Sequence, residues 1–177
     1  MRLVASLYLG FMMVLTAATG AAAQTWSEYR STEGRYRIQM PGKPEVSTEK
    51  VEVNGRELPL MEALVEAAGT VYLVTYIDYS AEEISSLTAL KILDNARDGA
   101  ARGSKLVSDR FLMVSGYPAR EYVAERDQGM VFVTRSVMAG VRLYQMIIVT
   151  LTPGGGADNP LTRRFIDSFA ITAAPPQ

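Results

Sequence analysis

Residues Tyr117–Leu151 read YPAREYVAERDQGMVFVTRSVMAGVRLYQMIIVTL. They form three extended runs, separated by short turns at Asp127–Gly129 and at Ala139-Gly140. In the second and third runs, apolar residues occupy both alternating faces, which is typical of strands buried on both sides. The stretch therefore predicts an antiparallel meander in the middle of a β-sheet.

Further alternating runs extend the predicted sheet toward the N-terminus. Asn54-Gly55 separates two of these runs and is the strongest short-range hairpin signal, because both residues tolerate the positive φ of a type I′ turn. Ala68-Gly69 marks the next turn. The expected strands cover Trp26–Arg30, Tyr36–Met40, Val46–Val53, Glu57–Ala67, Thr70–Tyr79 and Lys105–Val114.

Two segments have helical rather than strand periodicity. Residues Ser85–Arg102 place leucines at 87, 90 and 93, with Ser85 or Ser86 as the expected N-cap and Gly103 as the terminator. Asn159-Pro160 starts a shorter helix, because Asn is a good N-cap and Pro fits the first helical position. We therefore predict an α+β fold, with an antiparallel sheet of about seven to nine strands and two main helices.

The N-terminus has the pattern of a secretory signal peptide. Arg2 precedes an apolar run to Ala18, and small residues end at Ala23. We predict a signal peptide over residues 1–23 and one domain over residues 24–177; the alternative is a retained membrane anchor. The mature protein is expected in the bacterial periplasm or outside the cell, without further membrane attachment.

Composition excludes several classes of site. The sequence has no His and no Cys, so Ser-His-Asp triads, Cys nucleophiles and ordinary zinc sites are impossible. Its 18 basic and 19 acidic residues give a net charge of −1, which does not favour nucleic acid as a partner. We identify no catalytic residue, no metal site and no cofactor-binding motif.

Three short patterns have an ordinary structural interpretation. Ser47–Lys50 matches the S-x-x-K motif, but alternation places it on a strand, where the two side chains point to opposite faces. Asp94 and Asp98 could bind a divalent cation by their spacing, but we interpret them as part of a solvated helix face, balanced by Lys91, Arg97 and Arg102. Glycines 154–156 could bind an anion at a helix N-terminus, or act as a linker.

Arginines within apolar strands are less ordinary. Arg120, Arg135 and Arg142 lie on the three consecutive runs of the meander, near Tyr117 and Tyr144. Two converging guanidinium groups would bind a carboxylate or phosphate. These five residues are therefore the candidate ligand-binding set. The alternative is that each arginine reaches the sheet edge or pairs with an acidic residue such as Glu121, Glu125 or Asp127.

Four short phrases resemble exported bacterial domains of unknown function. They are EGRYRI at 33–38 with PGKP at 41–44, GYPARE at 116–121, RLYQ at 142–145, and RFIDSF at 164–169. Those domains are similar to the fold shared by the photosystem II protein PsbP and a yeast Ran-binding import factor. The resemblance implies an antiparallel sheet flanked by helices on both faces, and a binding or accessory role. It assigns no site residues.

Three functions remain open from the sequence. The first is a non-enzymatic binding or accessory module for an envelope protein or a small anionic ligand. The second is an enzyme that uses carboxylate, Tyr or Lys chemistry, which requires a pocket with several perturbed titratable groups. The third is a structural envelope protein. The sequence does not determine the oligomeric state.

Overall fold

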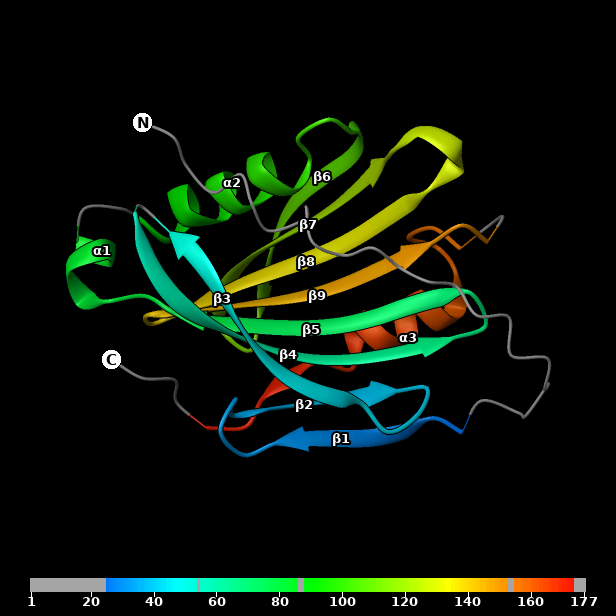
Figure 1. Cartoon of the computed structure of the whole chain (residues 1–177), viewed down its shortest axis with the longest axis horizontal. Coiled ribbons are helices and arrows are strands. Elements are labelled where there is room, and N and C mark those ends of the chain that lie inside the picture. The colour runs from blue at the N-terminus through cyan, green and yellow to red at the C-terminus, as the bar shows by residue number, and fades with distance from the viewer. Residues whose placement is uncertain (1–24, 54, 86–87, 153–154, 174–177) are drawn as a thin grey trace.

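The computed structural model describes residues 25–53, 55–85, 88–152 and 155–173. Within these residues, ten strands form two antiparallel sheets, a large sheet of seven strands and a small sheet of three (Figure 1). The strands of the large sheet are β3 (Glu45–Val53), β4 (Arg56–Ala67), β5 (Thr70–Asp78), β6 (Lys105–Val114), β7 (Tyr117–Glu125), β8 (Val131–Ala139) and β9 (Arg142–Thr150). Those of the small sheet are β1 (Ser27–Ser31), β2 (Tyr36–Met40) and β10 (Ala170–Ile171).

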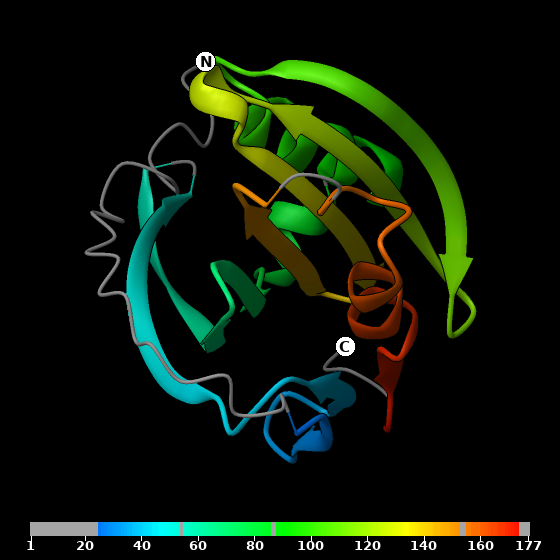
Figure 2. The same cartoon turned by 90° about the vertical axis from the view of Figure 1, so that its right-hand side faces the viewer.

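The predicted α+β class and antiparallel meander are confirmed. The strands of the large sheet are ordered β3-β4-β5-β9-β8-β7-β6, so that β9 and β8 lie near its centre. Figure 2 shows that the sheet is strongly curled, with β3 and β6 at its two ends. β3 and β6 are therefore the two edge strands of this open sheet.

The first two strands do not join the large sheet, as a single sheet would have required. β2 instead pairs with β1 on one side and with β10 on the other. Residues 41–44 (PGKP) separate β2 from β3, and proline at both ends interrupts the hydrogen-bond ladder there. β10 was not predicted, because two residues carry no alternation to recognise.

The helices are α1 (Ala81–Ser85), α2 (Ala89–Ala100) and α3 (Pro160–Asp167), and a short 3₁₀ turn, η1, covers Asp127–Gly129. α2 starts later than expected, because Thr88 is its N-cap and accepts a hydrogen bond from the backbone of Lys91. Asn159 caps α3 as predicted. None of these described helices combines the length and apolar character needed to cross a membrane.

The two faces of the large sheet bury different sets of apolar residues. One face packs against the small sheet, and Phe165 and Ile166 of α3 belong to the same cluster. The other face packs against Ile92 and Leu93 of α2. Because successive strand residues alternate between faces, the position of each side chain along its strand decides which layer it meets.

Candidate functional site

A pocket of about 180 Å³ lies between the β1–β2 hairpin and the adjoining part of the large sheet. Pockets for drug-sized ligands usually measure about 300–1,000 Å³, so this pocket suits a group the size of one side chain. The hairpin contributes Tyr29, Arg30, Ser31, Thr32, Glu33 and Tyr36; the large sheet contributes Val46, Met61, Glu62, Ala63 and Tyr76.

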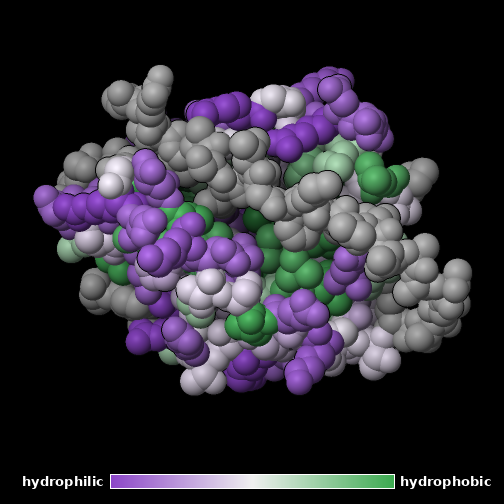
Figure 3. Space-filling model, in the orientation of Figure 1, coloured by the Kyte–Doolittle hydropathy of each residue, from purple (hydrophilic) through white to green (hydrophobic). Residues whose placement is uncertain are grey.

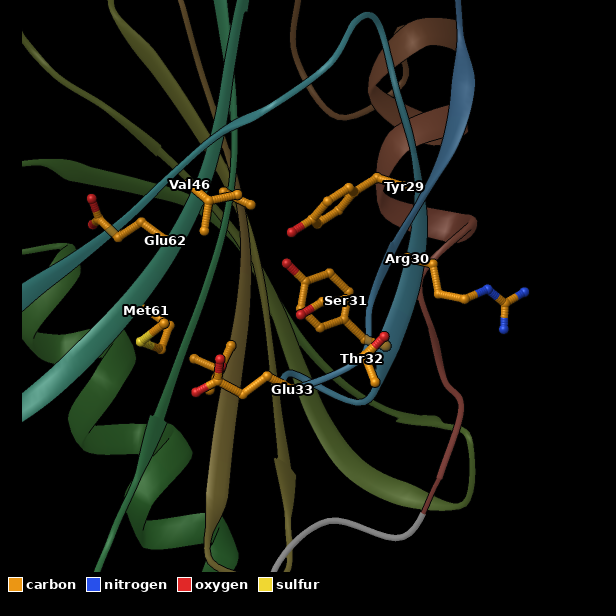
Figure 4. Close-up of a pocket in the computed structure, with 11 residues that line it drawn as sticks. Tyr29, Arg30, Ser31, Thr32, Glu33, Val46, Met61 and Glu62 are labelled. Atoms are coloured by element: carbon orange, nitrogen blue, oxygen red, sulfur yellow. The ribbon is translucent and has the colours of Figure 1, made fainter.

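The lining side chains do not all point into the pocket (Figure 4). Tyr29 and Glu33 extend from the hairpin toward the large sheet, whereas the guanidinium of Arg30 points away. The carboxylate of Glu62 also points away from the hairpin. This follows from strand alternation, since Met61 is its neighbour in β4 and faces the opposite side. Glu33 therefore supplies the carboxylate of the pocket.

The turn that carries Glu33 depends on a glycine. The backbone N–H of Gly34 donates to Ser31 Oγ over 2.9 Å. A Cβ atom at position 34 would lie 2.6 Å from that oxygen and 2.6 Å from the ring of Tyr36. Contacts this short would force the neighbouring side chains to shift, so glycine is favoured where the turn packs against Tyr36.

Two residues of β9 fasten this turn to the large sheet. Arg142 Nη1 donates to the carbonyl oxygen of Glu33 over 3.0 Å. The hydroxyl of Tyr144 donates to the carbonyl oxygen of Gly34 over 2.8 Å. The structure thus brings two residues of the predicted site together, but behind the pocket wall. They position the turn and do not line the pocket.

The charge of Arg142 is neutralised locally. Its Nε and Nη2 atoms donate to the two carboxylate oxygens of Asp78 over 2.6 and 2.7 Å. The guanidinium carbon also lies 4.3 Å from the ring centre of Tyr76. Burial disfavours the cation, but the hydrogen bonds and charge of Asp78 outweigh it and raise the pKa of Arg142. Asp78 therefore neutralises the charge of Arg142 behind the pocket.

Tyrosines form the aromatic part of the pocket. The ring centre of Tyr36 lies 6.0 Å from that of Tyr29 and 6.4 Å from that of Tyr76, in edge-on arrangements. Burial raises the pKa of Tyr36, and burial together with the charge of Glu33 raises the pKa of Tyr76 to about 12. Both phenols therefore remain neutral near pH 7 and act as hydrogen-bonding groups.

Glu33 has no neutralising cation in the described part of the chain. None of the ion pairs found there includes its carboxylate, whereas Glu28 on the same hairpin pairs with Arg30 and Arg37 at 2.9 Å each. The ring of Tyr76 already contacts the guanidinium of Arg142, and Tyr36 is buried, so Tyr29 is the lining tyrosine that can still approach a ligand. The carboxylate of Glu33, with the Tyr29 side chain beside it, thus makes the pocket favourable for a positively charged group.

Arg120 lies on the other face of the large sheet. It pairs with Asp94 of α2 and with Asp109 of β6, to which its Nε donates over 2.6 Å. Its guanidinium also lies 4.3 Å from the ring centre of Phe111. The hydrogen bonds from Arg120 lower the pKa of Asp109. The contacts of Arg120 therefore lie away from the pocket, and two carboxylates neutralise its guanidinium.

Arg135 belongs to a third group of charges, centred on the buried Glu121. Arg135 Nε donates to Glu121 over 2.8 Å, and its Nη2 contacts Asp167 at 2.7 Å. Burial opposes ionisation of Glu121, but hydrogen bonds from Arg163 and Arg110 and the charge of Arg135 lower its pKa to about 2. The expected pairing with Glu121 is confirmed for Arg135.

The five predicted ligand-binding residues are thus divided among separate places. Arg120, Arg135 and Arg142 each bind a different carboxylate, and these contacts form no shared fork. Tyr117 starts β7 opposite Val114 and packs, half-buried, against the core cluster beneath the small sheet. The partners of Arg120 and Arg142 differ from the acidic residues that we expected.

The structure accounts for the three short sequence patterns as far as it describes their residues. Ser47–Lys50 lies within β3, which confirms the strand interpretation. Asp94 pairs with Arg120, and Asp98 with Arg97. Across the described residues, no group of three or more His, Cys, Asp or Glu is arranged to hold a metal ion. Gly154 lies outside the described residues.

The sequence did not reveal the pocket. Its lining comes from β1, the following turn and strands β2 to β5. Alternation predicts that Met61 and Ala63 share a face, as do Tyr29 and Ser31. It does not say that these faces meet across two different sheets. Only the observed packing brings Glu33 next to Tyr76.

Comparison with known proteins identifies a fold. The sequence matches no protein-family model and no curated protein. The structure is similar to that of cyanobacterial PsbP from Synechocystis sp. PCC 6803, with a TM-score of 0.53, 13% identity, and coverage of 89% of this chain and 98% of that one. A protein of unknown function from Pseudomonas aeruginosa gives a TM-score of 0.36 at 11% identity, over 78% of this chain and 85% of that one. The similarity to cyanobacterial PsbP shows that the chain has a PsbP-like fold.

Proposed function

We propose that this protein is an exported, non-enzymatic binding module, and that its pocket accepts a small positively charged group. The observation that carries the proposal is the carboxylate of Glu33 at a pocket walled by Tyr29, Tyr36 and Tyr76, because no ion pair found among the described residues includes this carboxylate. The sequence suggested an anionic ligand, but the arginines on which that idea depended are each paired with a carboxylate.

Binding fits the protonation of the pocket better than catalysis does. A tyrosine acts as a base or nucleophile only when its pKa is lowered toward neutrality. Burial shifts Tyr36 and Tyr76 in the opposite direction. Lysine is absent from the described lining, and the one lining arginine, Arg30, points outward. The pocket can therefore hold a group by charge and aromatic contact.

Export is supported by the sequence pattern of residues 1–23, which lie outside the described residues. Cleavage after Ala23 would give a mature chain that starts at Gln24. N-terminal sequencing of the protein from the cell envelope tests this directly. Recovery of the protein with Met1 still present would contradict processing.

The pocket is tested by titrating the mature protein with acetyl-lysine methylamide while following the tyrosine ring resonances by NMR. We expect Tyr29 and Tyr76 to shift, and the neutral acetyl-norleucine methylamide to leave them unchanged. Glu33→Gln should weaken binding about three- to fivefold, as expected for an exposed ion pair of up to about 1 kcal/mol.

Glu28→Gln is the matched control, because that carboxylate lies on the same hairpin but already pairs with Arg30 and Arg37. It should leave the affinity for the lysine analogue unchanged. Equal shifts with the lysine and norleucine analogues, or equal effects of the two variants, would disprove a cation-selective pocket.

A further inference from the structure

The pocket borders a free edge of the large sheet. Among the described strands, β3 pairs with β4 alone. Residues Glu45–Lys50 of β3 are exposed on both faces. Val46, which lines the pocket, is 59% exposed although it is apolar. The edge and the pocket are thus continuous at this residue.

The register shows which backbone groups of β3 remain free. Val53 and Arg56 are paired across a two-residue turn, so they exchange hydrogen bonds, as do alternate pairs along the hairpin. Odd-numbered residues of β3 therefore bond to β4. Even-numbered residues, from Val46 to Glu52, direct their N–H and C=O groups outward. Pro59 lies opposite Lys50, at a pair that exchanges no hydrogen bonds within the hairpin. Its lack of a backbone N–H therefore agrees with this pattern.

A strand added to this edge would reach the pocket with its side chains. In an antiparallel pair, directly opposed residues point to the same face of the sheet. Val46 and Thr48 share the face of Met61, which lines the pocket. Side chains opposite these two residues would therefore point to the side of Glu33 and Tyr29.

The β3–β4 hairpin is strongly acidic. Residues 45–66 contain six glutamates against Lys50 and Arg56, a net charge of −4, whereas the whole chain has a net charge of −1. Glu52 lies directly opposite Glu57. Burial, with the charge of Glu49, also raises the pKa of Glu62. Figure 3 shows hydrophilic residues over the end of the molecule where the β3–β4 turn lies.

We propose that the ligand is an extended basic peptide segment, which adds to β3 as an antiparallel strand and inserts one Lys or Arg side chain into the pocket. This assignment rests on the proposed function, because it fills the same pocket. The free backbone groups provide pairing, and the acidic hairpin provides charge complementarity. A second copy of the chain is disfavoured at this edge, because both hairpins would carry a net charge of −4 and repel each other.

The opposite edge of the sheet is less suited to such pairing. β6 is interrupted by a bulge between Leu106 and Ser108. Bulges twist an edge strand and hinder the addition of another strand. β3 has an unbroken register with β4 from Glu45 to Val53. We therefore assign peptide addition to β3.

The probe is a capped, fluorescent seven-residue peptide of alternating valine and lysine, measured by anisotropy with the mature protein. In the proposed arrangement the lysines face the pocket side, and the same residues direct their N–H groups toward β3. N-methylation of the lysine amides should weaken binding at least tenfold, because several hydrogen bonds are lost. N-methylation of the valine amides, which face solvent, should leave binding unchanged.

A protein variant gives a second measurement. Thr48→Pro removes an outward N–H without removing a bond to β4, and should weaken peptide binding at least fivefold relative to Thr48→Ala. Thermal unfolding checks that both variants fold. If Thr48→Pro does not fold, the two methylated peptides still test strand addition on the wild-type protein.

The outcomes separate the two proposals. Equal binding of the two methylated peptides, with acetyl-lysine methylamide still bound in the pocket, would overturn strand addition and leave the proposed function intact. Loss of the response to both the peptide and the lysine analogue would overturn both. Peptide binding that depends on Thr48 but is unaffected by Glu33→Gln would overturn insertion into the pocket.

Discussion

The hydroxyl of Tyr144 donates a 2.8 Å hydrogen bond to the carbonyl oxygen of Gly34, a residue 110 positions earlier in the chain. Both atoms are buried, and the bond joins the centre of the large sheet to the turn of the small sheet. The same turn carries Glu33 into the pocket. The geometry of the pocket therefore depends on contacts with β9, outside its lining.

Tyr144→Phe should lower the free energy of unfolding by about 1–2 kcal/mol, because the carbonyl oxygen of Gly34 loses its buried donor. Urea denaturation measures the change. Tyr72→Phe is the control, since its hydroxyl makes no hydrogen bond found within the described chain and its ring packs against Phe165. Equal losses in the two variants would mean that the bond to Gly34 adds nothing.

Gly34→Ala should destabilise the protein by about 1–3 kcal/mol, since overpacking displaces neighbouring groups. The new methyl group would meet Ser31 Oγ and the ring of Tyr36. Gly156→Ala is the matched control, because no atom lies within 4 Å of its added Cβ. Thermal unfolding of both variants should show a lower Tm for the first alone; unchanged stability would show that the turn can move aside.

Arg142→Lys should weaken binding of acetyl-lysine methylamide as well as stability. Lysine keeps the charge but cannot donate to both oxygens of Asp78 and to the carbonyl oxygen of Glu33 at once. Arg120→Lys should reduce stability alone, because its contacts with Asp94 and Asp109 lie on the other face of the sheet. Isothermal titration calorimetry measures the affinity of each variant for acetyl-lysine methylamide, and urea denaturation measures its stability. A larger loss of binding in Arg120→Lys than in Arg142→Lys would show that Arg120 contributes to the ligand site.

Glu121 should make stability depend on acid pH. Its pKa is lowered from 4.5 to about 2 in the folded protein. A lowered carboxyl pKa contributes stability that is fully present above the unfolded value and is lost as pH falls toward the folded value. The shift corresponds to about 3 kcal/mol.

The measurement compares the wild-type protein with Glu121→Gln by urea denaturation at pH 7 and pH 3. The stability difference between them should be smaller at pH 3, since the carboxylate of the wild type is then losing its advantage. Glu125→Gln, on the exposed end of the same strand, should show little difference at either pH. A gap that stays constant with pH would contradict the assignment.

Local patterns predicted the strands well, because hairpin turns and alternation are properties of short segments. Asn54-Gly55 and Ala68-Gly69 connect paired strands in the structure. The predicted start of the long helix, with Ser85 or Ser86 as its N-cap, was wrong: Ser85 ends α1, and Ser and Thr are both good cap residues, so residue type alone does not fix the start. Thr88 is the cap that the structure uses.

Long-range pairing limited the prediction of the site. The partner of Arg135 could be guessed because Glu121 lies on the neighbouring strand. Asp78 is 64 positions from Arg142, and their contact requires the pairing of β5 with β9. The pocket requires still more, because the small sheet must first be placed against the large one.

The pairing of β2 with β10 has a consequence for the order in which the domain folds. Ala170 and Ile171 pair with Arg37 and Tyr36, so the small sheet joins residues from both ends of the domain. Such distant contacts form slowly, because a long loop must close first. The strands of the large sheet lie within residues 45–150, whereas the small sheet is complete only when β10, at residues 170–171, pairs with β2. The hairpin that carries Glu33 is therefore expected to be secured late in folding, when the last strand of the domain joins the first two.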